Sequence, residues 1–558
     1  MTTVTSVSAS TGQTSSSVDR SGLTEDEAVT TKIQPYLDQI NTIEDKVSTN
    51  ETKISYYQYM ESLLQNLESA VDTLSNPVDG TSDVFEQMTT ALSSSGSTAA
   101  STILSASVSS TAATGTHTVV VSQLATVERL SSGSQTSESS GLGYSGVFTL
   151  GESGESAAAF TVDSSMSLSD IASAINEQSS ATGVTASIIS ISSTSYQLLL
   201  TGADTDESIV MATQSGAALS DLGLAESDGS TAADVLQSAK PAILTVDGIS
   251  GIQRSTNDIS DILDGVTLNL TAADSGTTVT MAITHDTSSV ESAISSFVSA
   301  YNSWRSFVDL NQETDSDGGA DSDAILFGDS TLRDTSMEID DAITSFINGT
   351  SLSAIGISLT SQNTLSIDSS TLTDSLDNDF SLVQGLFGYE AATSSSDLKM
   401  TGHTNASYSG TFTLDISTDS SGNVTSVSGT DSSGNAVNFA YSGNVITGAS
   451  GSVYAGLTFR FSGSRSESIT VTAAQGVASQ LLSITDAAGD SSTGAVANIV
   501  STLQTEDTND ESRISELQTE ASNYETFLLD QYGTLEANIS EANLTASLLQ
   551  EMMSSDNS

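Results

Sequence analysis

The sequence contains no cysteine among its 558 residues, and only 3 prolines, 3 histidines and 1 tryptophan. The absence of cysteine excludes disulfide frameworks, thiolate metal sites and cysteine nucleophiles. Basic residues are also scarce, because 13 lysines and arginines face 70 aspartates and glutamates, which gives a formal net charge of −57. Since phosphates must be neutralised by basic side chains, neither a nucleic-acid partner nor binding to an anionic membrane surface is expected. Such an acidic surface fits a saline or extracellular setting.

Long hydrophobic runs are missing as well. No stretch approaches the roughly 18 apolar residues of a membrane span, so no membrane insertion is expected. Residues 1–23 are rich in serine and threonine, have no apolar periodicity, and lack a basic segment followed by an apolar one. We therefore expect a disordered tail without a cleaved secretory signal, so that any export would follow another route.

A heptad pattern follows this tail. Residues 24–27 have the composition of a helix capping box, and Asn76-Pro77 ends the pattern, because the residue before a proline disfavours helix. The spacing predicts a coiled-coil helix over 24–76, whose apolar stripe must be buried against another helix. Its predicted seam residues are Ile33, Leu37, Ile40, Val47, Ile54, Leu64, Leu67, Val71 and Leu74.

The C-terminal end has a similar arrangement. Residues 508–511 again resemble a capping box, and spacings of three and four then alternate to the end of the chain. The pattern predicts a coiled-coil helix over 508–558 with a weak seam, because alanine, glutamine, asparagine and threonine occupy several seam positions. A helix that packs on its own domain is the alternative. The predicted interaction residues are Ile514, Leu517, Tyr524, Leu528, Leu535 and Leu549.

Between the two ends, β-branched and aromatic runs alternate with glycine- and serine-rich breaks, which predicts β-strands. One short helix is expected among them, with Leu168, Ile171 and Ile175 on one face. The predicted fold class is therefore α+β multidomain, with long N- and C-terminal coiled-coil helices that flank a helical leg region and β-rich head domains. The expected segments are a tail (1–23), a coiled-coil helix (24–76), a connector with part of the leg (77–111), β-rich head domains (112–286) that include a repeat at 143–212, a helical leg (287–399), an inserted β domain (400–472), a helix and connector (473–507), and a C-terminal coiled-coil helix (508–558).

The residue types that carry most enzyme chemistry are not grouped. His117, His285 and His403 are isolated in the sequence, and no P-loop or dinucleotide-binding fingerprint is present. Residues 143–146 only half match a nucleophile elbow. The sequence therefore predicts no enzyme activity and no cofactor.

One acidic loop, residues 313–329, is a weak calcium candidate. Aspartates alternate there with small residues, as they do in calcium-binding loops, but the glycine and glutamate positions of an EF-hand are not matched. A solvated loop is the favoured interpretation, because acidic runs arise easily in so acidic a chain. The candidate ligands are Asp315, Asp317, Asp321 and Asp323.

Several motifs follow one another in an order that is known from one protein family. Ser-Gly-Leu-Thr at 21–24 precedes the first helix, and 121–125 reads Val-Ser-Gln-Leu-Ala. Residues 146–201 are similar to the flagellin hook-type repeat, and 297–304 reads Phe-Val-Ser-Ala-Tyr-Asn-Ser-Trp. In this order and spacing the chain resembles the flagellar hook-associated protein 2 family, the filament-capping proteins of bacterial flagella. Arg20 and Thr24 depart from the family's opening motif, and the block at 400–472 resembles a variable insertion.

The resemblance implies a secreted, extracellular, non-enzymatic cap at the distal tip of the flagellar filament. Such a cap prevents leakage of exported flagellin and promotes its polymerisation. The implied partners are further copies of the chain in a pentamer-like ring, flagellin subunits and an export chaperone. The helical legs would contact flagellin, and the β domains would form a plate. Two alternatives are another axial flagellar protein, such as a hook–filament junction protein or flagellin, and a secreted calcium-dependent adhesin. Adhesion is also a conceivable secondary role of a tip protein.

Overall fold

The computed structural model describes residues 25–75, 83–403 and 408–555. The chain divides into two compact units, and each is described by itself. The leg unit contains the described residues up to Val84 and from Thr287 onwards, and the head unit is Phe85–Asp286. The predicted α+β class with long helices at both ends is confirmed. The expected disordered tail, Thr24 of the first capping box, and Asn76-Pro77 lie outside the described residues.

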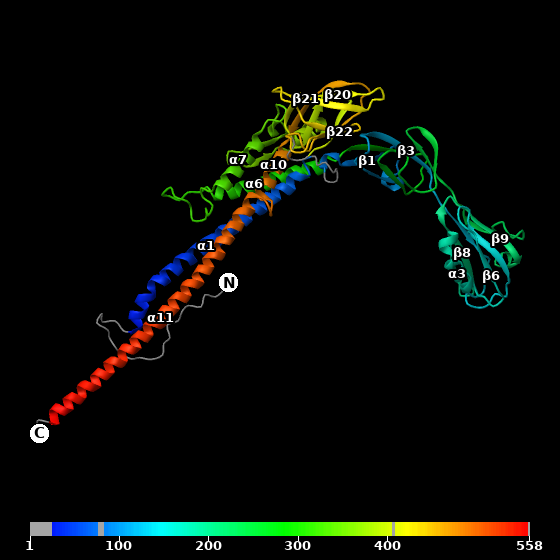
Figure 1. Cartoon of the computed structure of the whole chain (residues 1–558). Helices are drawn as coiled ribbons and strands as arrows, with labels where there is room; N and C mark the ends of the chain where they lie inside the picture. Colours follow the sequence, from blue (N-terminus) through cyan, green and yellow to red (C-terminus); the bar gives the residue numbers. More distant parts are fainter. Residues whose placement is uncertain (1–24, 76–82, 404–407, 556–558) are drawn as a thin grey trace. The chain divides into compact units, whose positions relative to one another are not determined.

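Two long helices dominate the leg unit and lie side by side (Figure 1). They are α1 (Glu25–Asp72) and α11 (Ala495–Ser555). Shorter helices pack around the C-terminal part of α1, and a two-stranded sheet joins them. These elements are α6 (Thr287–Leu310), α7 (Ser330–Thr344), α8 (Ser369–Asn378), α9 (Phe380–Phe387), α10 (Val477–Gly489), the short helix η2 (Leu352–Ile355), β16 (Ile357–Leu359) and β17 (Leu365–Ile367).

The packing of this bundle follows from apolar spacing. Ile294, Phe297 and Tyr301 recur at three- and four-residue steps along α6 and are fully buried. Residues three and four apart share one face of a helix, so this stripe must point into the bundle. A β-carbon added at Gly489 of α10 would lie 2.7 Å from Cβ of Leu64, so α10 and α1 approach closely at this glycine.

The leg unit also carries a β domain between α9 and α10, built from two four-stranded antiparallel sheets around an aromatic core with Phe412 and Phe459. The predicted boundaries of 400–472 are too narrow, because one strand precedes them, a second begins at Leu398, and the last strand ends at Gln475. Tyr389 and Leu398 of these early strands are buried in the same core. The strands are, in sheet order, β18 (Tyr389–Thr393), β25 (Glu467–Gln475), β20 (Gly410–Thr418) and β21 (Val424–Asp431), and then β19 (Leu398–Gly402), β24 (Thr458–Phe461), β23 (Val445–Gly448) and β22 (Phe439–Ser442).

The head unit holds two hydrophobic cores. The first lies between a five-stranded and a three-stranded antiparallel sheet, and alternation places Val266, Leu268 and Leu270 of one strand in it. The five-stranded sheet is β1 (Met88–Ser94), β15 (Val279–His285), β3 (Gly115–Gln123), β11 (Ala242–Val246) and β12 (Ile249–Arg254), and the three-stranded sheet is β13 (Asp258–Ile259), β14 (Val266–Leu270) and β2 (Leu104–Val108).

The second core of the head unit is enclosed by two further sheets and a helix. The helix is α3 (Leu168–Glu177), and its predicted face of Leu168, Ile171 and Ile175 is buried in this core. The sheets are, in strand order, β10 (Val235–Gln237), β4 (Val127–Ser131), β8 (Ser195–Thr205) and β7 (Val184–Ser192), and then β6 (Ala158–Val162), β5 (Gly146–Glu152) and β9 (Ile209–Gly216). Single-turn helices complete the chain at η1 (Val84–Glu86), α2 (Ala100–Ile103), α4 (Ser179–Thr182) and α5 (Ala218–Asp221).

Among the described helices, none combines the length and the apolar content that a membrane span needs.

Candidate interaction surface of the terminal helices

Three contacts show that α1 and α11 run antiparallel. The amide Nδ2 of Asn50 donates to Oδ1 of Asp507 at 2.7 Å, and Nζ of Lys46 lies 2.9 Å from Oδ2 of Asp510. Further towards the start of α1, the ring centroids of Tyr36 and Tyr524 are 6.2 Å apart. Residue numbers fall along α1 as they rise along α11, so the two ends of the chain form one antiparallel helix pair.

A buried polar contact sits within this pair. Asn50 and Asp507 are only 6% and 9% exposed. A buried carboxylate is costly without a donor, so the Asn50 amide offsets much of that cost. A polar pair inside a helix seam is satisfied in one register only, and therefore specifies how the two helices align. Asn50 was not among the predicted seam residues, although its position three residues after Val47 fits the heptad spacing.

Lys46 supplies positive charge beside this contact. Its ammonium group also lies 3.5 Å from Oε2 of Glu506, so it faces two carboxylates one turn apart on α11. The hydrogen bond to Asp510 is the main cause that raises the pKa of Lys46, and the charges of Asp510 and Glu506 add to it. In so acidic a chain, Lys46 supplies positive charge, and Asn50 supplies a hydrogen-bond donor, to the acidic turn of α11 that faces α1.

The apolar seam residues of this pair are only partly covered. Ile33 and Ile40 of α1 are buried, and Leu517 of α11 is buried. The other predicted seam residues in this region are half-buried, namely Leu37, Val47, Ile54, Ile514, Tyr524 and Leu528. Ala521 is also buried, and its small side chain leaves the seam little apolar area there. The seam is therefore narrow, as its alanine and polar positions suggest.

The second half of the predicted N-terminal seam has a different environment. Leu64, Leu67, Val71 and Leu74 are fully buried. However, α11 begins at Ala495, and these four residues follow the part of α1 that pairs with α11. They belong to the helix bundle instead, where Leu64 packs on Gly489 of α10. They were predicted as coiled-coil seam residues, but several helices surround α1 here.

Aromatic contacts tie the same part of α1 into the bundle. The hydroxyl of Tyr57 donates to Oδ2 of Asp329 at 2.6 Å, and the ring of Tyr59 meets that of Phe307 edge to face. Burial and then the carboxylate of Asp329 raise the pKa of Tyr57 well above its usual value, so this hydroxyl stays protonated and keeps donating.

The predicted capping box at 508–511 was also wrong. Helix α11 begins at Ala495 and runs through this segment, where the Thr508 hydroxyl donates to the Gln504 carbonyl one turn earlier. Buried Val496 and Val500 continue the apolar pattern towards the start of the helix. The turn before α11 is held by Asp490, whose carboxylate accepts the backbone N–H groups of Ser492 and Thr493. Hydrogen bonds from Thr493 and Ser492 strongly lower the pKa of Asp490.

The distal part of α11, which we define as residues 534–553, is largely exposed. Leu535 and Leu549 are 49% and 55% exposed, so these two predicted interaction residues are not covered. Ile539, Leu544 and Leu548 are exposed as well. The two helices are antiparallel, and Tyr36 of α1 faces Tyr524 of α11. Glu25, the first described residue of α1, therefore lies near the start of the distal part, and the described part of α1 does not extend along it.

The acidic loop at 313–329 does not gather its aspartates around one point. Oδ1 of Asp315 accepts the N–H groups of Asp317 and Gly319, and Oδ1 of Asp321 accepts that of Asp323. These carboxylates therefore stabilise turns of their own loop. Within the described ranges, no group of three or more histidine, aspartate or glutamate side chains is placed to hold a metal ion.

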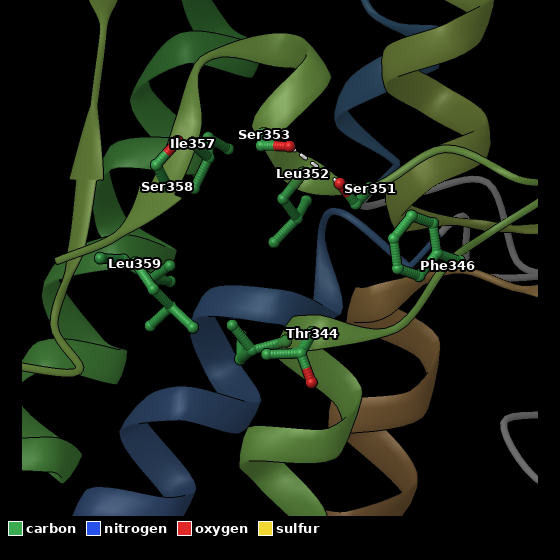
Figure 2. A pocket seen from close by; sticks show the side chains of 10 residues that line it. Thr344, Phe346, Ser351, Leu352, Ser353, Ile357, Ser358 and Leu359 are labelled. Atoms are coloured by element: carbon green, nitrogen blue, oxygen red, sulfur yellow. Dashed lines mark hydrogen bonds between the residues drawn. The ribbon is translucent and has the colours of Figure 1, made fainter. Parts of the chain in front are cut away.

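A hollow of about 340 Å³ opens on the leg unit beside the end of α7 (Figure 2). Its lining is mostly apolar, with Ile343, Leu352 and Leu359 among its residues and an exposed Phe346. The hydroxyls of Ser351 and Ser353 lie 2.9 Å apart and hydrogen-bond to each other. The lining contains no acid, base or charged group, so the hollow can receive an apolar side chain but offers no acid–base chemistry.

These features define a multidomain α+β protein whose two chain ends form an antiparallel helix pair. Family models agree with that architecture. The model described as flagellar hook-associated protein 2 C-terminus matches residues 239–544, and the corresponding N-terminus model matches 21–128. The flagellin hook IN motif matches 147–204. The C-terminal model alone covers more than half of the sequence, so the chain belongs to the flagellar hook-associated protein 2 family, as its motifs predicted.

Curated relatives carry the same family name. The B-type flagellar hook-associated protein 2 of Pseudomonas aeruginosa is 28% identical over 303 residues, which span 51% of this chain and 64% of that protein. The flagellar hook-associated protein 2 of Escherichia coli O157:H7 is 31% identical over 321 residues, spanning 54% of this chain and 68% of that protein. The matches thus span about two thirds of these relatives.

Solved structures of similar chains include the D1-D2-D3 domains of the flagellar cap protein FliD from Escherichia coli. That match has 27% identity and a TM-score of 0.46, and covers 60% of this chain and 89% of that structure. FliD (HAP2) from Pseudomonas aeruginosa PAO1 matches with 26% identity and a TM-score of 0.32, covering 38% of this chain and 98% of that structure.

Proposed function

We propose that this chain is a non-enzymatic cap at the distal tip of the bacterial flagellar filament, where it retains exported flagellin and promotes its polymerisation. Family membership supports this proposal, as does the name "flagellar cap protein" of the similar Escherichia coli structure. The observation that carries it is the exposed distal part of α11. Leu535, Leu544 and Leu549 present apolar surface there, and exposed apolar surface of this kind marks interaction sites.

In the proposed assembly, several copies form a pentamer-like ring at the filament tip. The terminal helices act as legs that contact flagellin subunits, and the β domains form the plate that blocks their escape. A chaperone would accompany the chain before export. The filament tip is an extracellular location.

The weak helix pair suits a cap that moves as subunits are added. Its seam holds half-buried apolar residues, a small Ala521 and the polar Asn50–Asp507 pair, so separating the helices costs less than separating an all-leucine seam. Pro35 lies inside α1 and removes one backbone hydrogen bond there, which makes this part of the leg easier to bend. Leg movement would open one insertion site at a time.

The test is a truncation that ends the chain at Gly533, within a strain that carries no other copy of the cap gene. We expect short or absent filaments and flagellin monomer in the medium, because the paired seam remains but its exposed extension is lost. Normal filaments would overturn the proposal. A matched control, Ile249→Ser, changes an exposed aliphatic residue in the head unit and should leave filament growth intact. Circular dichroism and detection of the truncated chain outside the cell show that it folds and is exported.

The two alternatives receive less support. The family models disfavour flagellin or a junction protein, since they match at both ends of the chain. A calcium-dependent adhesin would require a metal site, and the acidic loop uses its carboxylates within its own turns.

A further inference from the structure

The outer strand of one head-unit sheet combines three features that are rarely left together on a protein surface. Strand β7 lies at the edge of the sheet β10-β4-β8-β7 and pairs with β8 only. Edge strands present unpaired backbone groups, and proteins usually protect them with charges, prolines or coverings. The three features are unpaired backbone groups, exposed apolar side chains beside them, and the absence of charge nearby.

The chain itself covers the first half of this edge. The Asn176 amide on α3 accepts from the N–H of Ala186 and donates to its carbonyl, both at 2.8 Å. The Thr182 hydroxyl accepts the N–H of Val184 at 3.3 Å. The N–H of Val184 and both backbone groups of Ala186 therefore point away from β8 and are already satisfied.

The second half of the edge is open. Backbone groups alternate in direction along a strand, and the pairing of β7 with β8 is regular from Val184 to Ser190. The N–H and carbonyl groups of Ile188 and Ser190 consequently point the same way as those of Ala186. Within the described part of the chain, no side chain or backbone group bonds to them. A further strand could therefore add at this position.

Exposed isoleucines accompany these open groups. Ile189 and Ile191 are 45% and 59% exposed, and Ile189 lies on the face of β7 opposite the side that enters the core. Charge is absent as well, since residues 178–203 contain no aspartate, glutamate, lysine or arginine. Within residues 178–203, no charged side chain is present to repel an added strand.

The lack of charge at this edge, on an otherwise acidic chain, points to a second copy of this chain as the occupant rather than to a basic partner. A basic partner would be drawn to the acidic surface, whereas two copies of net charge −57 repel each other except where charge is missing. An antiparallel strand edge is also self-complementary about a two-fold axis. Pairing Ile188 with Ser190 of the second copy, and the reverse, uses all four open groups and places the two Ile189 residues opposite each other.

We propose that the Ile188–Ser190 edge of β7 is a self-association surface, through which two copies of this chain pair antiparallel about a two-fold axis. A two-fold contact is closed, so it joins two chains and cannot generate a ring by itself. The pairing is therefore additional to the proposed ring and independent of the proposed cap function. Because both copies are acidic, the pairing strengthens as salt screens their repulsion.

The absence of native cysteine makes the test direct, since any disulfide must involve an introduced residue. In the proposed pairing, the two residues at position 189 form a non-hydrogen-bonded pair with Cα atoms about 4.5 Å apart, which lies within the range for a disulfide. Ile189→Cys in the full chain should therefore give a disulfide-linked dimer under mild oxidation. The matched control is Ile249→Cys, an exposed isoleucine on another edge strand, β12.

We expect the dimer of Ile189→Cys to form about tenfold faster than that of Ile249→Cys, and faster still in about 1 M salt, where the Debye length is about 3 Å. In sedimentation experiments, Ile191→Lys should raise the dissociation constant of the pair about tenfold, which corresponds to about 1.4 kcal/mol. Equal rates for the two cysteine variants would overturn the proposal, as would an Ile189→Cys chain that links to a different protein. Filament growth in the same variants reports separately on the cap function.

Discussion

The part of α1 after residue 54, its bundle half, buries Leu64, Leu67 and Val71 completely, whereas Leu37, Val47 and Ile54 in residues 25–54, its paired half, keep part of their surface in solvent. Both halves have apolar residues at similar spacing. The difference lies in the surroundings, because the paired half faces one helix, α11, while the bundle half is enclosed by α6, α10 and their neighbours. Similar spacing of apolar residues thus leads to different degrees of side-chain burial in the two halves.

This contrast determines which part of the leg opens first. Burying a leucine fully contributes roughly 1.5–3 kcal/mol, and a half-buried one contributes correspondingly less. The bundle half is therefore a stable base, and the paired half is held by a few apolar contacts and polar groups. Segments with few buried contacts open locally well before global unfolding. A leg that must release and rebind its partner would use this property.

The largest expected effect comes from the bundle half. Leu67→Ala should lower the free energy of unfolding of the leg unit by about 2–5 kcal/mol, because it removes a fully buried side chain and leaves a cavity. Leu37→Ala, at a half-buried position, serves as the matched comparison and should cost clearly less. Denaturant unfolding followed by circular dichroism measures both. Equal losses would show that the two halves of α1 do not differ in stability.

A second prediction concerns the polar contact of the paired half. Asn50→Ala should destabilise the helix pair by about 1–3 kcal/mol, since it leaves the Asp507 carboxylate buried without its donor. Hydrogen exchange should accelerate in residues 25–54 and remain unchanged in the bundle half.

The double variant Asn50→Leu with Asp507→Leu tests the cause. Replacing both partners by apolar residues should recover the lost stability, because no buried charge remains. If the double variant is as unstable as Asn50→Ala, the loss does not arise from the unpaired carboxylate.

The sequence was sufficient to predict that both terminal helices exist, because a heptad period is a local property of the chain. It was not sufficient for their partners. Leu64 meets Gly489, and Asn50 meets Asp507, which is 457 residues away. Nothing in the spacing of α1 distinguishes a residue that faces one helix from a residue inside a bundle.

Local sequence patterns also gave wrong or incomplete predictions where tertiary packing determines the structure. Threonine three residues before glutamate suggested a cap at 508–511, but in a chain rich in threonine and acid this pattern also occurs within a helix. Strands β18 and β19 were missed because they are short and only partly apolar, although Tyr389 and Leu398 are buried in the core. The open edge of β7 required knowledge of which strand ends the sheet, and of Asn176 beside it.

A smaller effect is expected from the ion pairs of Lys46. Lys46→Met keeps most of the apolar stem but removes the charge that faces Asp510 and Glu506, so the helix pair should loosen at low salt. The difference from the unmodified chain should shrink at high salt, because these groups are partly exposed and salt screens them. Hydrogen exchange of residues 25–54 at two salt concentrations measures it, with Lys32→Met as control. A salt-independent loss would indicate that packing, not charge, is responsible.

Substitutions in the distal part of α11 should have the smallest effect on stability and the largest effect on filament assembly. Leu549→Ser changes an exposed side chain in the distal part of α11, so the free energy of unfolding should stay within about 0.5 kcal/mol of the original. If the exposed leucines contact flagellin, the same substitution combined with Leu544→Ser should nevertheless shorten filaments and release flagellin monomer. Leu67→Ala would then weaken folding, and the distal variants would weaken filament growth alone. Distal variants that grow normal filaments would instead show that these leucines are not used for contact, and the paired half of the leg would remain as its binding surface.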